Sequence, residues 1–318
     1  MTDASPTRPP SRLARALRAA VRYGILLAQV LAYAAIVVRI GFRDGHAVTA
    51  PLYYAVPPVV AAFVFALAAA LDWSVGSRAR PRAGRLALVL LLLAWQGRAS
   101  WRGHEPRDGA MRVLVWNAAH GRDGWDRIAE EIALHDPELV ALVEAHGAVD
   151  ALRSRLGTHA WVDGGSGMVV GTRGTDTAIE TERVDLGDGG RALLFTIPKA
   201  ERRTYGVLVD LVPDPLRHRA EAFAHLDRLV ALRAPDLIVG DFNTPRDSVF
   251  FDAWRPRLRH AFEDAGRGLD TTWPWPLPVL AIDHAWSGPR LEPRACRLVG
   301  TTSSDHRIVI AEYAWVGR

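Results

Sequence analysis

Three long apolar runs stand out in the first hundred residues of this 318-residue chain, at 19–38, 50–71 and 86–95. The first two have the roughly twenty residues that a helix needs to cross a bilayer core of about 30 Å. The third is short and is bounded by Arg85 and Arg98, so it spans only if these arginines snorkel towards the interface. The pattern predicts about three transmembrane helices over 19–97.

A cleaved signal peptide and a soluble helical bundle are the two alternatives to membrane spans. A signal peptide does not fit, because a second long apolar run follows the first and no small-residue cleavage site stands out. A soluble bundle requires helices with a polar face, and these runs have none. We therefore expect a multi-pass membrane protein.

The arginines predict the side of the membrane on which each part lies, since cytoplasmic loops carry an excess of positive charge. The tail over 1–18 holds four arginines and the second connecting loop holds four more, whereas the first loop holds two and an aspartate. The tail and the second loop are therefore expected in the cytoplasm. Three spans place the rest of the chain outside and two place it inside; we expect three, and hence an extracytoplasmic domain.

Beyond a polar Gly/Arg/Pro segment at 98–110, expected as a linker, the pattern changes to short apolar runs typical of buried strands. Helices are predicted over 123–134, with Asp123 as N-cap, and over 216–233, with short pieces near 248–264. Strands are predicted at 112–117, 139–144, 168–172, 178–184, 191–197, 204–212, 237–241, 280–286, 293–299 and 307–314. This order indicates an α/β domain over 111–318, with two sheets face to face and helices outside.

Charge is divided unevenly between the two parts of the chain. Residues 1–110 hold 14 Lys and Arg against 5 Asp and Glu, a net charge of +9, whereas 111–318 hold 25 against 30, a net charge of −5. The second part gives no strong sign of nucleic-acid binding, because such binding depends on positive charge that neutralises phosphates. The single cysteine, Cys296, excludes an intrachain disulfide and is expected in the core.

Several apolar strands have polar residues at their ends that suit a divalent metal ion and a phosphate ester. These residues are Asn117, Glu144, Asp241 with Asn243, and Asp305 with His306. Strand ends allow a rigid scaffold to bring together side chains from distant parts of a sequence. Glu144 and Asp305 are hard oxygen ligands for Mg²⁺ or Mn²⁺, and such a cation neutralises a phosphate oxygen.

The other polar groups have candidate roles around the same phosphate. Asp241 would orient or deprotonate the attacking water, and Asn243 would hold a phosphate oxygen. His306 would donate to the phosphate, and Asp283 would fix the orientation of its imidazole. Each residue alone has a structural alternative, such as a strand-end turn, a solvated loop start or a surface pair. Their joint occurrence in this order is what indicates a catalytic site.

The motifs resemble those of the endonuclease/exonuclease/phosphatase superfamily, which includes pancreatic-type (DNase I-like) deoxyribonucleases, sphingomyelinases and inositol phosphatases. They are Trp116-Asn117, Glu144, Gly240-Asp241-Phe242-Asn243, Ile282-Asp283-His284 and Ser304-Asp305-His306. The likeness covers residues 111–314, and the last three motifs are the specific ones. It implies a four-layer α/β sandwich, dependence on Mg²⁺ (or Mn²⁺), and in-line attack of water on phosphorus. It also supports Asn117, Glu144 and Asp305 as metal ligands, and catalytic roles for Asp241, Asn243, Asp283 and His306.

One position departs from the family pattern. The family usually has a histidine at the end of the strand before the long helix, where this chain has Val209-Asp210-Leu211. Asp210 either binds a second cation or a substrate hydroxyl at that place, or it is an ordinary strand-end residue after a register shift. His284 is a further candidate beside Asp283. The Pro/Trp segment 271–278 is either a substrate entrance or a rigid core loop.

Apolar spans joined to this set of motifs look like the bacterial membrane-anchored branch that includes the teicoplanin-resistance protein VanJ. Proteins of that kind are linked to dephosphorylation of polyprenyl pyrophosphate lipids. The resemblance implies a phosphohydrolase of the bacterial plasma membrane, with the lipid bilayer and a phosphorylated lipid as its partners. Tethering favours this reading, because it raises the effective concentration of the site against lipid head groups. A tethered nuclease and a non-enzymatic binding module are the alternatives, and no obligate protein partner is evident.

Overall fold

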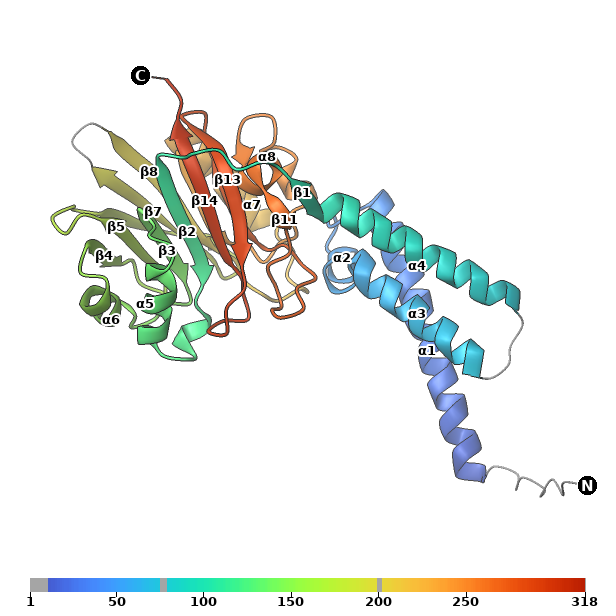
Figure 1. The fold of residues 1–318 in the computed structure, drawn as a ribbon. Coiled ribbons are helices and arrows are strands. Elements are labelled where there is room, and N and C mark those ends of the chain that lie inside the picture. Colours follow the sequence, from blue (N-terminus) through green and yellow to red (C-terminus); the bar gives the residue numbers. More distant parts are fainter. Residues whose placement is uncertain (1–10, 75–78, 199–201, 318) are drawn as a thin grey trace, which may run out of the picture.

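The computed structural model describes residues 11–74, 79–198 and 202–317 of the chain. The first ten residues of the expected cytoplasmic tail and residues 75–78 of the second arginine-rich loop lie outside the described residues. Figure 1 shows two parts, a β-rich body and a group of helices that projects from it. We refer to them as the body, from residue 101 onwards, and the helical region, before it.

The helical region consists of α1 (Arg12–Gly41), α2 (Ala50–Ala55), α3 (Pro58–Ser74) and α4 (Ala79–Ser100). The prediction of one continuous helix over 50–71 is wrong. Proline lacks a backbone N–H and disfavours a helical conformation at the residue before it, so α2 ends ahead of Pro57 and Pro58 begins α3. The three long helices pack on one another through small and aromatic side chains around Phe65.

By length and composition, α1 is the one helix among the described residues that is able to cross a membrane, over Arg15–Gly41. The segment Pro58–Leu71 is apolar but shorter. The expectation of three full-length spans is therefore not supported, because the proline pair shortens the second apolar run and arginines bound the third. Large apolar side chains are nevertheless exposed on all three long helices, among them Leu27, Phe63 and Leu90.

Two six-stranded mixed sheets form the body. The order of the first is β13 (Leu291–Val299), β14 (Ile308–Trp315), β2 (Met111–Asn117), β3 (Leu139–Val143), β5 (Val169–Arg173) and β4 (His159–Asp163). The order of the second is β10 (Arg259–His260), β12 (Asp283–Ser287), β9 (Leu237–Asp241), β8 (Arg203–Asp210), β7 (Gly190–Pro198) and β6 (Glu180–Gly187). Among the described strands, β2–β3 and β8–β9 are the parallel pairs, and each is connected through a helix, α5 (Trp125–Ala133) and α7 (Ala220–Arg233).

Successive side chains along each strand fill different cores, because they point to opposite faces of a sheet. In β2, Val113 lies in the core between the sheets, whereas Leu114 packs towards α5 and α6 (Val149–Arg155). In β9, Val239 lies in the same central core, whereas Ile238 packs against α7. The layers run helix, sheet, sheet, helix, so the predicted four-layer α/β sandwich is confirmed.

Two local predictions are wrong. The helix expected from Asp123 begins at Trp125, and its N-cap is Gly124 with φ of 92°, a conformation that glycine adopts freely. The segment expected as a linker is ordered at its start, since α4 continues to Ser100 and β1 (Trp101–Gly103) pairs with β11 (Arg267–Leu269). The remaining described elements are η1 (Ala119–Gly121), η2 (Val249–Phe251) and α8 (Ala261–Ala265).

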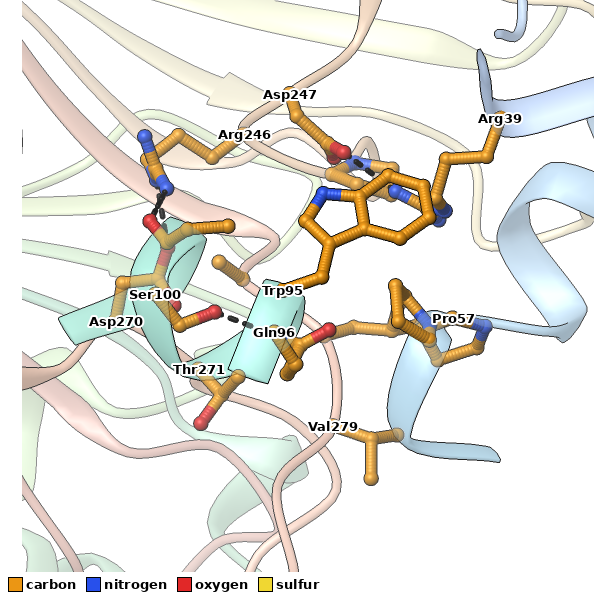
Figure 2. A pocket seen from close by; sticks show the side chains of 15 residues that line it. Arg39, Pro57, Trp95, Gln96, Ser100, Arg246, Asp247, Asp270, Thr271 and Val279 are labelled. Carbon is orange, nitrogen blue, oxygen red and sulfur yellow. Dashed lines mark hydrogen bonds and ion pairs between the residues drawn. The ribbon is translucent and has the colours of Figure 1, made fainter. Parts of the chain in front are cut away.

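The helical region is joined to the body by buried polar contacts on the loop that follows Asn243. Figure 2 shows Arg39 of α1 facing Asp247 of this loop, with which it forms an ion pair. Arg246 of the same loop donates to the carbonyl of Ala99 at the end of α4 (2.6 Å) and pairs with Asp270 (2.6 Å). The two parts therefore meet directly behind the Gly-Asp-x-Asn motif.

Candidate active site

A cavity of about 500 Å³ opens where β2, β3 and β9 end and where β14 begins. Its polar lining contains six of the residues predicted from strand ends: Asn117, Glu144, Asp241, Asn243, Asp305 and His306. Asp283, the first residue of β12, lies behind His306 and is hydrogen-bonded to it. The structure thus brings these seven side chains together from five separate parts of the body.

Gly240 places Asp241 at the base of the pocket. Its φ is 135°, and a Cβ atom at this position would lie 2.1 Å from the carbonyl oxygen of Val209 on the neighbouring strand. Only glycine allows this close approach of β9 to β8. The buried Asp241 carboxylate then accepts hydrogen bonds from Asn117 Nδ2 (3.0 Å) and from the backbone N–H of Asn243 (2.8 Å).

Burial, followed by the nearby Asp283 carboxylate, raises the pKa of Asp241 to about 8. The His306 imidazole and the two hydrogen bonds to the carboxylate act in the opposite direction. A raised pKa makes the ionised carboxylate a stronger proton acceptor than an ordinary aspartate, and the ionised fraction of Asp241 grows as the pH rises through about 8. Asp241 therefore has the environment of a general base.

Asp283 and His306 form a buried pair beside Asp241. Asp283 Oδ2 lies 2.9 Å from His306 Nδ1, and His306 Nε2 lies 3.9 Å from Asp241 Oδ2. Burial by itself lowers the pKa of His306, but the Asp283 carboxylate outweighs it, and the pKa is raised to about 10. The imidazole is thus protonated at neutral pH, and its Nε2 carries a hydrogen to donate.

Glu144 and Asp305 supply carboxylates on another side of the pocket. Glu144 directly follows β3 with φ of 53°, in the left-handed region, and its Oε2 lies 3.2 Å from His120 Nε2. Asp305 Oδ2 accepts a hydrogen bond from Trp273 Nε1 (3.1 Å). Non-glycine residues rarely adopt a positive φ, and such conformations are concentrated at functional sites.

Oxygen donors of the kind that hard divalent cations prefer line this pocket. Asn117 Oδ1 accepts one hydrogen bond, from Ala119 N (3.0 Å), and keeps a second lone pair, so it is a candidate ligand, as are the Glu144 and Asp305 carboxylates of the same lining. Another group of candidate ligands among the described residues is Asp241, Asp283 and His306, whose ligand atoms lie within 4.8 Å of one another. An ion bound there would displace the hydrogen bond between Asp283 and His306.

Two further candidates do not line the pocket. His284 points to the opposite face of β12 from Asp283, as neighbouring strand residues do, and its ring contacts the Thr244 carbonyl (2.9 Å) and His260 (3.2 Å). Burial lowers the pKa of His284 to about 4, so this imidazole is a neutral core residue. Asp210 pairs with Asp241 in the β8–β9 register, and burial, followed by the Glu144 carboxylate, raises its pKa to about 6. It lies beside the acidic residues at the same edge of the sheet.

Sequence patterns missed two residues of the pocket, Arg219 and Tyr54. Arg219 is buried just before α7, donates to the carbonyl of Asn243 (3.3 Å), and lies over the Tyr54 ring at 5.6 Å. Tyr54 belongs to α2 of the helical region. No local sequence pattern distinguished Arg219 from its neighbours Arg217 and His218. Nothing in the apolar run 50–71 indicated that Tyr54 would line a pocket of the body.

The comparisons with known proteins agree with the architecture. The model of the endonuclease/exonuclease/phosphatase family matches residues 114–306. The fold is similar to that of the Bacteroides thetaiotaomicron mannosyl-6-phosphatase, with a TM-score of 0.54 and 17% identity over 64% of this chain and 99% of that one. It is also similar to the human Nocturnin catalytic domain with bound sulfate, with a TM-score of 0.53 and 17% identity over 66% and 95%. No curated protein matches the sequence.

A third similar structure is that of D. rerio TDP2 complexed with a single-strand DNA product, with a TM-score of 0.53 and 15% identity over 64% of this chain and 98% of that one. At these identities the similar structures support the fold alone. The family match is broader evidence, because it spans more than half of the chain and runs from β2 to the Asp-His motif. The chain therefore belongs to the endonuclease/exonuclease/phosphatase family, whose enzymes hydrolyse phosphate esters and generally use a divalent metal ion.

Proposed function

We propose that this protein is a membrane-anchored, Mg²⁺- or Mn²⁺-dependent phosphohydrolase that acts on phosphorylated lipids, with polyprenyl pyrophosphates as the first class to test. The observation that carries the proposal is the composition of the pocket. Acidic and amide side chains of the body line it together with Tyr54, Ala55 and Pro57 of the apolar helical region. A substrate that carries both a phosphate and an apolar group matches this mixed lining.

The exposed surface of the helical region supports the membrane part of the proposal. Leu27 of α1, Phe63 of α3 and Leu90 of α4 are 61%, 68% and 68% exposed, and contiguous apolar surface of this kind marks contact with lipid or another protein. In this proposal α3 and α4 enter the bilayer beside α1, in a multi-pass arrangement. With such an arrangement, the distribution of arginines favours an extracytoplasmic position for the body.

Hydrolysis would use the residues in the positions described above. Glu144, Asp305 and Asn117 would hold the cation, which when bound neutralises charge on a phosphate oxygen. Asp241 accepts a proton from water while the water oxygen bonds to phosphorus and the bond from phosphorus to the leaving oxygen breaks. His306, held in orientation by Asp283, donates a hydrogen bond to a phosphate oxygen.

Asn243 completes the phosphate site in this mechanism. Its Nδ2 donates one hydrogen to the carbonyl of Leu211 (2.7 Å), and the second N–H of the same group is left for a phosphate oxygen. Its φ of 46° turns the chain directly after β9, a conformation that asparagine tolerates better than most residues. The turn and the hydrogen bond together hold the amide at the pocket.

The test is phosphate release from undecaprenyl pyrophosphate by the purified full-length protein in detergent. We expect release with Mg²⁺ or Mn²⁺, none with EDTA, and recovery when the cation is restored. Asp305→Asn should abolish release, whereas Asp150→Asn, at an exposed position on α6, should retain it. Absence of release with either cation would contradict the proposal. Nicking of plasmid DNA in a parallel reaction, without lipid hydrolysis, would favour a nuclease.

A further inference from the structure

Arg219 is a buried cation in the pocket lining to which the proposed mechanism assigns no role. It directly precedes α7, and only 2% of its surface is exposed. Burial of a charged side chain costs free energy unless other groups replace the water that it loses. The contacts of this guanidinium therefore show which parts of the molecule depend on it.

Backbone carbonyl oxygens, rather than carboxylates, accept the hydrogen bonds of this guanidinium among the described residues. Its Nη1 donates to the carbonyls of Asp214 (3.0 Å) and Arg217 (2.8 Å), and its Nη2 donates to the carbonyl of Asn243 (3.3 Å). The first two contacts fix the turn before α7. The third reaches the Gly-Asp-x-Asn motif, so one rigid planar group connects two loops that are far apart in the sequence.

The main chain at Asn243 controls two groups of the proposed mechanism. Its N–H donates to Asp241 Oδ1 (2.8 Å), and its side-chain amide is held at the pocket by the carbonyl of Leu211 (2.7 Å). Its φ of 46° is a conformation that a non-glycine residue keeps only when neighbouring contacts enforce it. The hydrogen bond from Arg219 is one of these contacts, because it restrains the carbonyl of the same residue.

The helical region supplies a contact of a different kind. The guanidinium carbon of Arg219 lies 5.6 Å from the centroid of the Tyr54 ring, within the roughly 6 Å over which an aromatic face attracts a cation. The Tyr54 hydroxyl donates to one oxygen of the buried Asp44 carboxylate (3.0 Å), and the other oxygen accepts from the backbone N–H of Val249 (3.0 Å). His218, next to Arg219, lies 3.1 Å from the carbonyl of the same aspartate. Asp44 thus holds α2 against the turn that carries the arginine.

We propose that Arg219 is a positioning residue for hydrolysis, which keeps the turn at Asn243 in its reactive geometry and is itself held by the Tyr54 ring. It acts through Asn243 and needs no contact with the substrate or the cation. This inference rests on the proposed function and deepens it, because the geometry of the active site then depends on a segment outside the matched family domain at 114–306. Docking of α2 on the body becomes a condition for full activity.

The first test changes the arginine. In the full-length protein in detergent with Mg²⁺, Arg219→Met should lower kcat for undecaprenyl pyrophosphate about 10- to 100-fold, since small displacements of reactive groups have costs of this size. KM should change much less than kcat, as is typical of a residue that aligns the reacting groups rather than binding the substrate. The matched control is Arg217→Met, the same change at a half-exposed position outside the pocket lining, and it should keep both constants.

The second test asks whether Tyr54 acts through Arg219. Tyr54→Leu removes the ring and should lower kcat severalfold, whereas Tyr54→Phe keeps the ring and should lower kcat less, although it loses the hydrogen bond to Asp44. In a protein that already carries Arg219→Met, Tyr54→Leu should cause no further loss of kcat, because the guanidinium that the ring holds is gone. Thermal unfolding of each variant shows that it is folded.

Three results would overturn the positioning role and leave the proposed function standing. They are an unchanged kcat in a folded Arg219→Met variant, a loss confined to KM, and additive losses of kcat in the double variant. If Arg219→Met does not fold, the two Tyr54 variants decide, and equal kcat values for Tyr54→Leu and Tyr54→Phe would overturn the role. Absence of phosphate release by the unchanged protein would overturn the proposed function and the positioning role with it.

Discussion

The body buries most of its large apolar side chains, whereas the helical region leaves many of them exposed. In the body, consecutive strand residues such as Leu114, Val115 and Trp116 are all buried, because one face of the sheet packs on helices and the other on the second sheet. In the helical region, Leu27 and Leu90 remain exposed although their helices pack on one another. The body thus encloses its own core, whereas the helical region leaves large apolar side chains exposed.

The two parts nevertheless share one site, and this is what the comparison teaches. The body supplies the groups suited to a cation and a phosphate, and Tyr54, Ala55 and Pro57 of the helical region line the same pocket. Polar groups cross the joint between them: Arg39 of α1 pairs with Asp247, and Arg246 donates to the carbonyl of Ala99 at the end of α4. Changes in each part should therefore have separable effects on chemistry, on the joint and on membrane insertion.

The largest effect is expected on the rate of hydrolysis, without any change in membrane insertion. His306→Gln removes the cationic donor held by Asp283 and should lower kcat about 10²–10⁴-fold. The membrane-bound fraction should not change, because the residue lies in the body. Phosphate-release kinetics and membrane fractionation measure the two effects, with His225→Gln on α7 as the control. A variant that keeps full activity would remove His306 from the mechanism.

The second largest effect is expected on the free energy of unfolding, when Arg246 beside the joint is changed. Arg246 pairs with Asp270 (2.6 Å) and Glu263 (2.8 Å), and the arginine and Asp270 side chains are only 10% and 5% exposed. Arg246→Met leaves the buried Asp270 carboxylate without its cation, although Glu263 keeps its ion pair with Arg255 (3.0 Å), and should cost about 3–5 kcal/mol in the free energy of unfolding. Thermal unfolding in detergent measures this loss of stability. The control Arg153→Met removes an exposed ion pair with Asp150 and should cost about 1 kcal/mol or less. Equal losses of stability in the two variants would show that the Arg246 contacts contribute no more than an exposed ion pair.

Membrane insertion should respond to a charge on the exterior of α1. Leu27→Asp, near the middle of Arg15–Gly41, should disfavour insertion by about 2.5–3.5 kcal/mol and lower the membrane-bound fraction. Leu134→Asp, at a still more exposed position after α5 in the body, should have no such effect. If both variants partition like the unchanged protein, α1 does not contact lipid at Leu27.

The smallest effect is expected at the contact that holds α2 on the body. Tyr54→Phe deletes one hydrogen bond to Asp44 and should lower the free energy of unfolding by about 1 kcal/mol or slightly more. Tyr205→Phe, at a partly exposed position on β8, serves as the control and should be near neutral. A loss as large as that of Arg246→Met would mean that Asp44 also depends on this hydroxyl for its other contacts.

Much of the body could be predicted from local sequence patterns. Apolar runs located most strands of both sheets but missed the short edge strands β4 and β10, and polar residues next to the located strands identified much of the pocket, including Glu144 and Asp305. Strand periodicity is a property of neighbouring residues, so it can be read directly from the chain. The same alternation implies that Asp283 and His284 face opposite ways, but it does not say which of the two faces the pocket.

The sequence by itself determined the elements, the family motifs and the uneven distribution of apolar and charged residues. Only the tertiary structure decided that Asn117 donates to Asp241, that Asp283 rather than His284 contacts His306, and that Tyr54 lines the pocket. The physical reason is that these contacts join segments far apart in the chain. They depend on sheet order and on how the helical region docks, which no local pattern of side chains encodes.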